Sequence, residues 1–247
     1  MKTEAKLTII TSQNPAVLGK RYEMTKDGIS KKTAGQMLQG VFRVHSFTDA
    51  SSLAALLGQI GTDQALIASL PTVGELEGSI VTKAKKSSTP GAIARTKNDF
   101  QFPVGQPGVI VFDYDPIGHA KTREQLWEFL QSVGVGNCGA VWWCSGSSFI
   151  YHGDIEINGL RGQRIYLTVM DVADTVRVGE VLGKRFWLDG LGRVEISASG
   201  QRLTRSVFDA AMFEPARLDF IGGAVCESPL SQRRGLPEVL CDGGYLC

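Results

Sequence analysis

Long apolar runs and targeting signals are absent from the sequence. A helix needs about 20 consecutive apolar residues to span a bilayer, and no run among the 247 residues approaches that length. The first residues, MKTEAKLTIITSQ, contain an acidic residue and no extended apolar core, unlike a secretory signal peptide. We therefore expect a cytoplasmic protein with no membrane partner.

Cysteine and histidine are scarce and scattered. The five cysteines, of which none forms a CxxC pair, are Cys138, Cys144, Cys226, Cys241 and Cys247. Structural zinc sites usually contain such close pairs, so zinc is disfavoured and reduced thiols are expected. Three dispersed histidines do not supply the cluster that a metal-dependent nicking relaxase needs. No GxxxxGK[ST] motif indicates an ATPase module.

The chain has almost no net charge, since Lys and Arg number 26 and Asp and Glu number 25. This balance argues against the strong overall positive field that attracts nucleic acids. The charges are nevertheless unevenly placed, with basic residues in excess over residues 1–100 and acidic residues in excess over residues 101–183. A local acidic centre beside basic flanks is what a cation site facing a polyanion requires.

The first hundred residues favour a small α/β part. LTII and ALIASL have the composition of short buried strands, and a helix is expected after Asp49 or Ser51, with leucines along one face. Residues 83–100 are basic and interrupted by Pro and Gly, which predicts a loop that either connects two elements or contacts phosphates. We expect residues 1–100 to form an N-terminal α/β part that ends in this basic loop.

Residues 101–247 alternate between strand and helix signals. GVIVFDYD is an apolar strand that ends in acids, Thr122 is a suitable N-cap for the helix REQLWEFLQSVG, and GAVWWCSGSSFIY predicts a strand pair or a bulged strand. The remaining segments are the strand RIYLTVMDV, the helix VRVGEVLGKRFWLDG, and the strand-forming RVEIS and LTRSVFDAAMF. From Val109 to Phe208 this order is that of a split βαβ sheet. We therefore predict an α+β fold with an RRM-like catalytic sheet.

Three aspartates are the candidate catalytic residues. Asp113 and Asp115 in FDYD share one strand face, because residues i and i+2 point the same way. Two adjacent carboxylates repel unless a cation lies between them, and Mg²⁺ or Mn²⁺ suits such a pair, although a strand end that merely reaches solvent has the same pattern. Asp209 in SVFDAA would join them if the first and last strands are neighbours, and Glu195 is the rival third ligand.

Side chains suited to a nucleotide's phosphates follow the first two acids. They are Ser145, Ser147 and Ser148 in CSGSSFIY, His152, Arg161 and Arg164 in GLRGQRIY, and Arg202 and Arg205. Hydroxyl and guanidinium groups donate hydrogen bonds to phosphate oxygens, and the intervening glycines allow the backbone to approach closely. An arginine taken alone is more often a solvated or ion-paired surface residue.

The order of these motifs resembles the catalytic domain of the archaeo-eukaryotic primase, or primase-polymerase, superfamily, of the kind found in plasmid, phage and integrated-element replication proteins. The resemblance rests on VFDYD, SGSS, the Gly-rich turn of GLRGQRIYLTV, and VFD after a basic stretch, within roughly residues 105–230. It implies that Asp113, Asp115 and Asp209 bind two divalent metal ions.

One position departs from the family pattern. The family's second motif usually ends in a His just before the strand that contacts the nucleotide's phosphates, and Arg164 stands at that position here. Three alternatives stay open: Arg164 makes the phosphate contact, which its fork of donors allows, or His152 makes it in a different register, or catalysis is altered.

The resemblance implies template-dependent nucleotidyl transfer by two-metal catalysis. Such a primase or DNA polymerase uses NTPs or dNTPs to make or extend primers on single-stranded DNA, and a helicase, fused in a longer polypeptide or separate, is the expected partner. Two alternatives remain. One is a non-catalytic module that binds an origin or single-stranded DNA. The other is a metal-dependent glycosyltransferase, which also combines a D-x-D motif with a nucleotide diphosphate.

Overall fold

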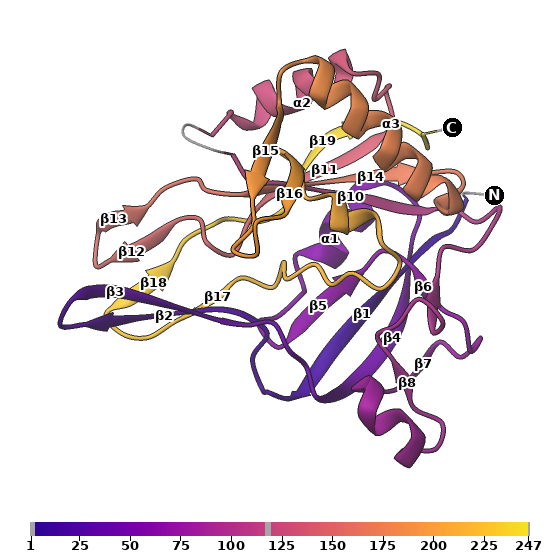
Figure 1. Cartoon of the computed structure of the whole chain (residues 1–247), viewed down its shortest axis with the longest axis horizontal. Coiled ribbons are helices and arrows are strands. Elements are labelled where there is room, and N and C mark those ends of the chain that lie inside the picture. Colours follow the sequence, from indigo (N-terminus) through magenta and orange to yellow (C-terminus); the bar gives the residue numbers. More distant parts are fainter. Residues whose placement is uncertain (1–2, 117–119, 247) are drawn as a thin grey trace.

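Helix α1 (Ala50–Leu57) packs between two β-sheets in the computed structural model, which describes residues 3–116 and 120–246. The architecture is α+β, as predicted, and strands predominate over helices. Figure 1 shows helices α2 (Arg123–Ser132) and α3 (Thr175–Leu188) above one sheet, the second sheet below it, and an arm of hairpins extending to the left.

The N-terminal sheet has five strands in the order β5-β1-β4-β7-β8. They are β1 (Ala5–Asn14), β4 (Gln39–Phe47), β5 (Gln64–Ile67), β7 (Glu77–Val81) and β8 (Ile93–Ala94). All neighbours are antiparallel except β7 and β8. Helix α1 follows β4 directly and begins at Asp49, whose carboxylate accepts a hydrogen bond from the Ser52 amide at 2.8 Å.

The C-terminal sheet has four strands in the order β10-β14-β11-β19, and every neighbouring pair is antiparallel. They are β10 (Gly108–Tyr114), β11 (Gly139–Cys144), β14 (Gln163–Val169) and β19 (Glu238–Asp242). Strands β10 and β11 are therefore parallel to each other, joined by α2, with β14 between them. Strands β10 and β11 are buried throughout, which explains their nearly continuous apolar sequences.

Helix α2 begins and ends where the sequence predicts. The Thr122 hydroxyl accepts a hydrogen bond from the Gln125 amide at 3.3 Å, and the Gln125 side chain accepts one from the Thr122 amide at 2.9 Å. Just after the helix, Gly134 adopts a φ of 99°, a left-handed conformation that favours glycine and ends the helix.

The arm contains two small sheets. In one, β2 (Gly19–Thr25) lies between β3 (Gly28–Ala34) and β17 (Ala224–Cys226), and in the other β12 (Ile150–His152) lies between β13 (Ile155–Asn158) and β18 (Leu230–Gln232). Both sheets lie on the left of Figure 1. Strands from the beginning, middle and end of the chain therefore build this arm together.

The remaining elements are short. Strand β6 (Leu70–Pro71) pairs with β9 (Phe100–Gln101), β15 (Gly192–Ile196) forms a hairpin with β16 (Arg202–Ser206), and the 3-10 helices are η1 (Lys83–Ser88), η2 (Val172–Asp174) and η3 (Ala210–Phe213). None of the helices within residues 3–116 and 120–246 is long and apolar enough to cross a membrane.

The largest apolar cluster draws on both halves of the chain. Leu7 of β1 and Leu53 of α1 belong to the same buried cluster as Val111 of β10 and Leu167 of β14, and all four are at most 1% exposed. Burial of such apolar surface is the main favourable contribution to folding. The N-terminal part and the C-terminal sheet therefore depend on each other for their main core.

Three predicted segments differ in the structure. Residues 83–100 are a loop only in part, since they contain η1 and β8, and Lys86 pairs with Asp99. GAVWWCSGSSFIY forms two strands of different sheets, and the β12–β13 hairpin is inserted before β14. LTRSVFDAAMF is a strand only as far as Ser206, because the Asp209 side chain caps η3. Apolar periodicity does not encode which sheet a strand joins.

Candidate functional site

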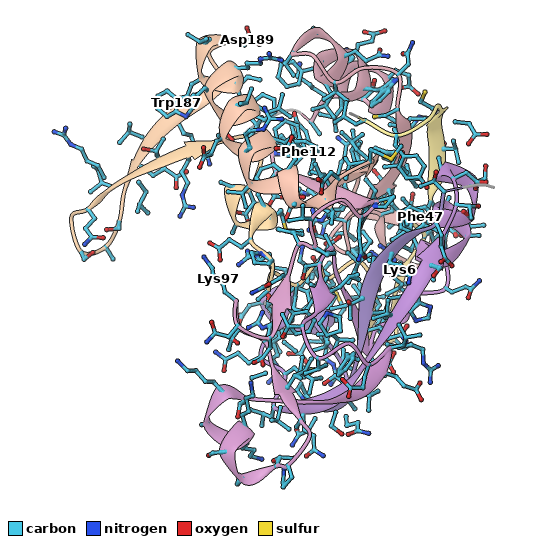
Figure 2. All side chains as sticks on the ribbon, turned by 90° about the vertical axis from the view of Figure 1, so that its right-hand side faces the viewer. Lys6, Phe47, Lys97, Phe112, Trp187 and Asp189 are labelled. Carbon is cyan, nitrogen blue, oxygen red and sulfur yellow. The ribbon has the colours of Figure 1, made fainter. Side chains whose placement is uncertain are left out.

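Asp113 lies at the end of β10, and Asp115 follows the strand directly. Alternation along β10 places Phe112 and Tyr114 on the side of α2 and α3, where each ring packs against Phe208 with centroids 5.5 Å apart. Figure 2 shows Phe112 among the side chains next to α3. Asp113 therefore faces the other side of the sheet, towards the N-terminal half of the chain.

Residues 207–209 run along the edge of β10 that β14 leaves open. The Asp209 amide donates a hydrogen bond to the Asp113 carbonyl at 3.0 Å, and the Asp115 amide donates one to the Val207 carbonyl at 3.0 Å. The predicted adjacency of these two segments is therefore present, and it brings Asp209 beside the acidic pair.

The carboxylate of Asp209 already has partners. It accepts a hydrogen bond from the Ala211 amide at 3.0 Å and pairs with Arg217 at 2.9 Å. These contacts fix the start of η3. Asp209 is therefore close to Asp113 and Asp115, but its oxygens are directed to its own segment.

Arg164 lies between two carboxylates. Its guanidinium pairs with Asp113, and its Nε donates a hydrogen bond to Asp219 at 2.9 Å, while only 11% of its side chain is exposed. The Tyr166 hydroxyl donates to the second oxygen of Asp219 at 2.5 Å. Arg164 is thus part of a buried ion-pair network that joins β10 and β14 to Asp219, and the phosphate contact that is one of its three alternatives would have to compete with these partners.

Burial and neighbouring acids both disfavour the charged form of Asp113. Burial raises the pKa of Asp113 to about 7, because the charged form loses its hydration. Arg164 opposes this rise, whereas Asp115, Asp219 and Asp209 add to it. Although burial disfavours the charge on Arg164, the neighbouring Asp113 and Asp219 raise its pKa above the usual value.

A divalent cation would favour the charged forms of these carboxylates. Within the described ranges, no three His, Cys, Asp or Glu side chains converge on a ready-made metal position. The carboxylates of Asp113 and Asp115 nevertheless have the oxygen donors that Mg²⁺ and Mn²⁺ prefer, and Asp209 lies on the adjoining segment but is paired with Arg217. The residues therefore fit a cation held chiefly by Asp113 and Asp115.

A cleft of about 600 Å³ opens beside Asp115, and we call it the basic cleft. Its polar lining is Lys20, Lys31, Asp115, Ser147, Asn158 and Arg161, and its apolar lining includes Tyr22, Ile29, Ile157 and Leu160. The Lys20 ammonium donates a hydrogen bond to the Ser147 hydroxyl at 2.9 Å. Burial lowers the pKa of Lys20, and the nearby Arg164 lowers it further.

The serine turn forms one wall of the basic cleft. Ser145 and Ser148 are buried, and the Ser148 hydroxyl accepts a hydrogen bond from the Arg161 amide at 3.0 Å. Ser147 lines the cleft, with its hydroxyl 2.8 Å from that of Ser145. Of the three predicted serines, Ser147 therefore faces the cleft, while the other two hold the turn in shape.

Asp115 also lines a second cleft, of about 270 Å³, which we call the hairpin groove. Its polar side chains are Asp115, Arg193, Glu195, Thr204, Arg205, Ser206 and Asp209. Glu195, the rival metal ligand, pairs with Arg193 at 2.7 Å and with Arg205 at 3.5 Å. Glu195 is therefore held by arginines of its own hairpin.

Two predicted phosphate-binding residues lie away from these clefts. His152 is exposed on β12 in the arm, and Arg202 is exposed at the start of β16. Neither lines the basic cleft or the hairpin groove. Arg161 and Arg205, by contrast, line the basic cleft and the groove respectively.

Three further residues belong to the site without having been predicted. Lys20 and Lys31 come from the β2–β3 hairpin, whose turn carries the Asp-Gly signal typical of hairpins, but no local pattern reveals that the hairpin lies next to Asp115. Asp219 could have been found from the sequence, because it is a single acid in the otherwise apolar segment LDFIGG. An acid that is buried in such a segment requires a partner.

No family model, curated protein or solved structure matches this chain. The functional inference therefore depends on the geometry described above.

Proposed function

We propose that the chain is a template-dependent nucleotidyltransferase of the primase-polymerase type, which makes or extends primers on single-stranded DNA during replication of a plasmid, phage or mobile element. The observation that carries this proposal is that Asp115 lines the basic cleft, and Asp113 lies two residues before it, at the buried end of β10. A nucleoside triphosphate complexed with a divalent cation needs carboxylates for the cation and basic donors for the phosphates, within reach of each other.

The topology of the C-terminal sheet supports an RRM-like interpretation. Strand β10, helix α2, strands β11 and β14, helix α3 and residues 207–209 follow one another in the order of a split βαβ unit. Strand β14 lies between β10 and β11, and residues 207–209 flank the other edge of β10. Strand β19 and the inserted β12–β13 hairpin are additions to this unit.

Each side chain has a distinct role in the proposed reaction. Lys20, Ser147 and Arg161 bind the triphosphate in the basic cleft, and Asp113 and Asp115 hold the cation. When bound, Mg²⁺ or Mn²⁺ neutralises negative charge that develops on the phosphates. A hydroxyl oxygen bonds to the α-phosphorus as the bond to pyrophosphate breaks, the pyrophosphate leaves with the electron pair, and the hydroxyl proton passes to water.

A non-catalytic module that binds single-stranded DNA is the second candidate. It is favoured by the ion pair between Arg164 and Asp113, which occupies a carboxylate that catalysis needs for the cation. A glycosyltransferase explains the D-x-D motif but gives no role to Asp209, which lies beside it.

A primer-synthesis assay tests the proposal. The protein is incubated with single-stranded DNA, labelled nucleotides and Mg²⁺ or Mn²⁺, and we expect template-dependent products from the wild type and none from Asp113→Ala/Asp115→Ala. The matched control is Asp154→Ala/Asp189→Ala, which removes two exposed acids outside both clefts and should synthesise normally.

The other candidates predict different outcomes in the same assay. DNA binding without synthesis by the wild type would favour the non-catalytic module. Transfer from a labelled nucleotide sugar, tested in a parallel reaction, would favour the glycosyltransferase.

A further inference from the structure

Asp115 is shared by two clefts, and only the basic cleft has a role in the proposed function. The basic cleft lies on the β14 side of β10, and the hairpin groove lies on the side of residues 207–210. In-line phosphoryl transfer places the attacking and leaving oxygens on opposite sides of the phosphorus. A triphosphate in the basic cleft therefore leaves the hairpin groove for the strand that carries the attacking hydroxyl.

Two arginines of the hairpin are placed for phosphates. Arg193 and Arg205 are directly opposite each other in the β15–β16 register, so they share one face of the hairpin, and both line the groove with Asp115. Each pairs with Glu195. Because partly exposed ion pairs are weak, either arginine can exchange Glu195 for a phosphate oxygen at little cost.

Further cations lie beyond Asp209. Arg217 pairs with Asp209 at 2.9 Å, Lys97 lies 3.9 Å from Glu214, and their side chains are 45% and 70% exposed. Figure 2 shows Lys97 extending outward on the side of the molecule on which the β15–β16 hairpin projects. Together with Arg193 and Arg205, these exposed cations are separate positive groups that could each contact a different phosphate of a strand.

We propose that the hairpin groove binds single-stranded DNA, with Arg193 and Arg205 on its phosphates, and directs the strand's hydroxyl to Asp115. The direction of the strand rests on the proposed function, but binding in the groove does not depend on catalysis. Arg202, which the sequence placed with Arg205, is opposite Ile196 in the register, on the other face of the hairpin. Arg202 should therefore contribute little to DNA binding in the groove.

The test measures the binding of a fluorescein-labelled oligothymidylate by anisotropy, with a chelator present and no nucleotide. We expect Arg193→Ala/Arg205→Ala to weaken binding roughly tenfold at low salt, and to reduce the slope of log K against log salt by about 0.7 for each lost phosphate contact. Arg202→Ala, compared with the single variants Arg193→Ala and Arg205→Ala, is the matched control, because each removes one arginine and Arg202 lies on the opposite face of the same hairpin.

A variant that is expected to bind DNA more tightly distinguishes the loss of a contact from misfolding. Glu195→Gln removes the acid that pairs with both arginines, so it should tighten binding several-fold. Equal affinities for the wild type and Arg193→Ala/Arg205→Ala, or equal losses with Arg202→Ala, would overturn the inference. If the groove variants lose binding while the wild type fails to synthesise primers, DNA binding in the hairpin groove is supported and the proposed function is contradicted. If synthesis succeeds and the groove variants bind normally, the inference alone falls.

Discussion

The backbone amide of Asp209 donates a hydrogen bond to the carbonyl of Asp113 at 3.0 Å. This contact attaches the segment after β16 to the free edge of β10, so that acids from distant parts of the chain meet at one place. It also positions the hairpin groove and the basic cleft on the two sides of Asp115.

Arg164 should be essential for stability. Arg164→Ala leaves Asp113 and Asp219 buried without their cation, and loss of one member of a buried ion pair typically costs about 3–5 kcal/mol. Urea denaturation measures the change in the free energy of unfolding. Arg43→Ala is the control, because Arg43 pairs with Glu77 at the surface, with both side chains about two-thirds exposed, and should cost less than about 1 kcal/mol. Equal effects would show that the Arg164 network is not important for folding.

Asp113 should make stability depend on pH. Its pKa is raised to about 7 by burial, whereas a carboxyl in the unfolded chain titrates near pH 4. Between these values the folded state holds a proton that the unfolded state has released, so the free energy of unfolding falls as the pH rises through this window. Asp113→Asn removes the effect, and between about pH 5 and pH 7 the variant should gain about 2 kcal/mol relative to the wild type, at ~1.4 kcal/mol per pKa unit.

Denaturation of both proteins across this range measures the difference. The exposed Asp154→Asn should retain the pH dependence of the wild type. Parallel curves for the wild type and Asp113→Asn would contradict a raised pKa at Asp113.

Local signals made part of this site predictable. The apolar run before Asp113 and Asp115 predicts the strand that ends at them, and the strand-helix order predicts the adjacency of the Asp209 segment and β10. Helix ends were equally readable, because Asp49 and Thr122 cap their helices through side-chain hydrogen bonds within four residues.

Long-range placement was not predictable in this way. Lys20 lies on β2, which pairs with β17 near the end of the chain, and its ammonium contacts Ser147, far from it in the sequence. A phosphate contact by Arg164 is one of the three alternatives that the family's second motif leaves open, but the sequence does not reveal that Arg164 pairs with Asp219, which is distant in sequence. The sequence order of charges does not reveal which of them neutralise each other in the folded protein.

Gly162 should be required for the position of Asp115. A Cβ at residue 162 would lie 2.5 Å from the Asp115 carboxylate oxygen and 3.2 Å from the Ser145 hydroxyl. Because the side chain of Asp115 can move aside, Gly162→Ala should change the melting temperature little and weaken Mn²⁺ binding several-fold, as measured by titration calorimetry. Gly136→Ala is the control, since nothing lies within 4 Å of its added Cβ. Unchanged Mn²⁺ affinity in Gly162→Ala would argue against Asp115 as a cation ligand.

Lys20 should determine nucleotide affinity. Its ammonium lies in the basic cleft, within hydrogen-bond distance of Ser147 and close to Asp115. A charge-assisted hydrogen bond contributes about 1.5–3 kcal/mol, so Lys20→Ala should raise the KM for the nucleotide about tenfold or more and change kcat less. Lys20→Arg, which keeps the charge, should recover part of the affinity.

Lys32 provides the matched control for Lys20. It lies on the neighbouring strand β3, where it pairs with Glu23 at 2.5 Å and is 67% exposed, outside the basic cleft. Lys32→Ala removes the same charge from the same hairpin, so long-range electrostatic attraction alone would change both variants equally. A rise in KM that is confined to Lys20→Ala therefore identifies a direct contact with the triphosphate, whereas equal rises in both variants would mean that the hairpin acts only through its overall charge.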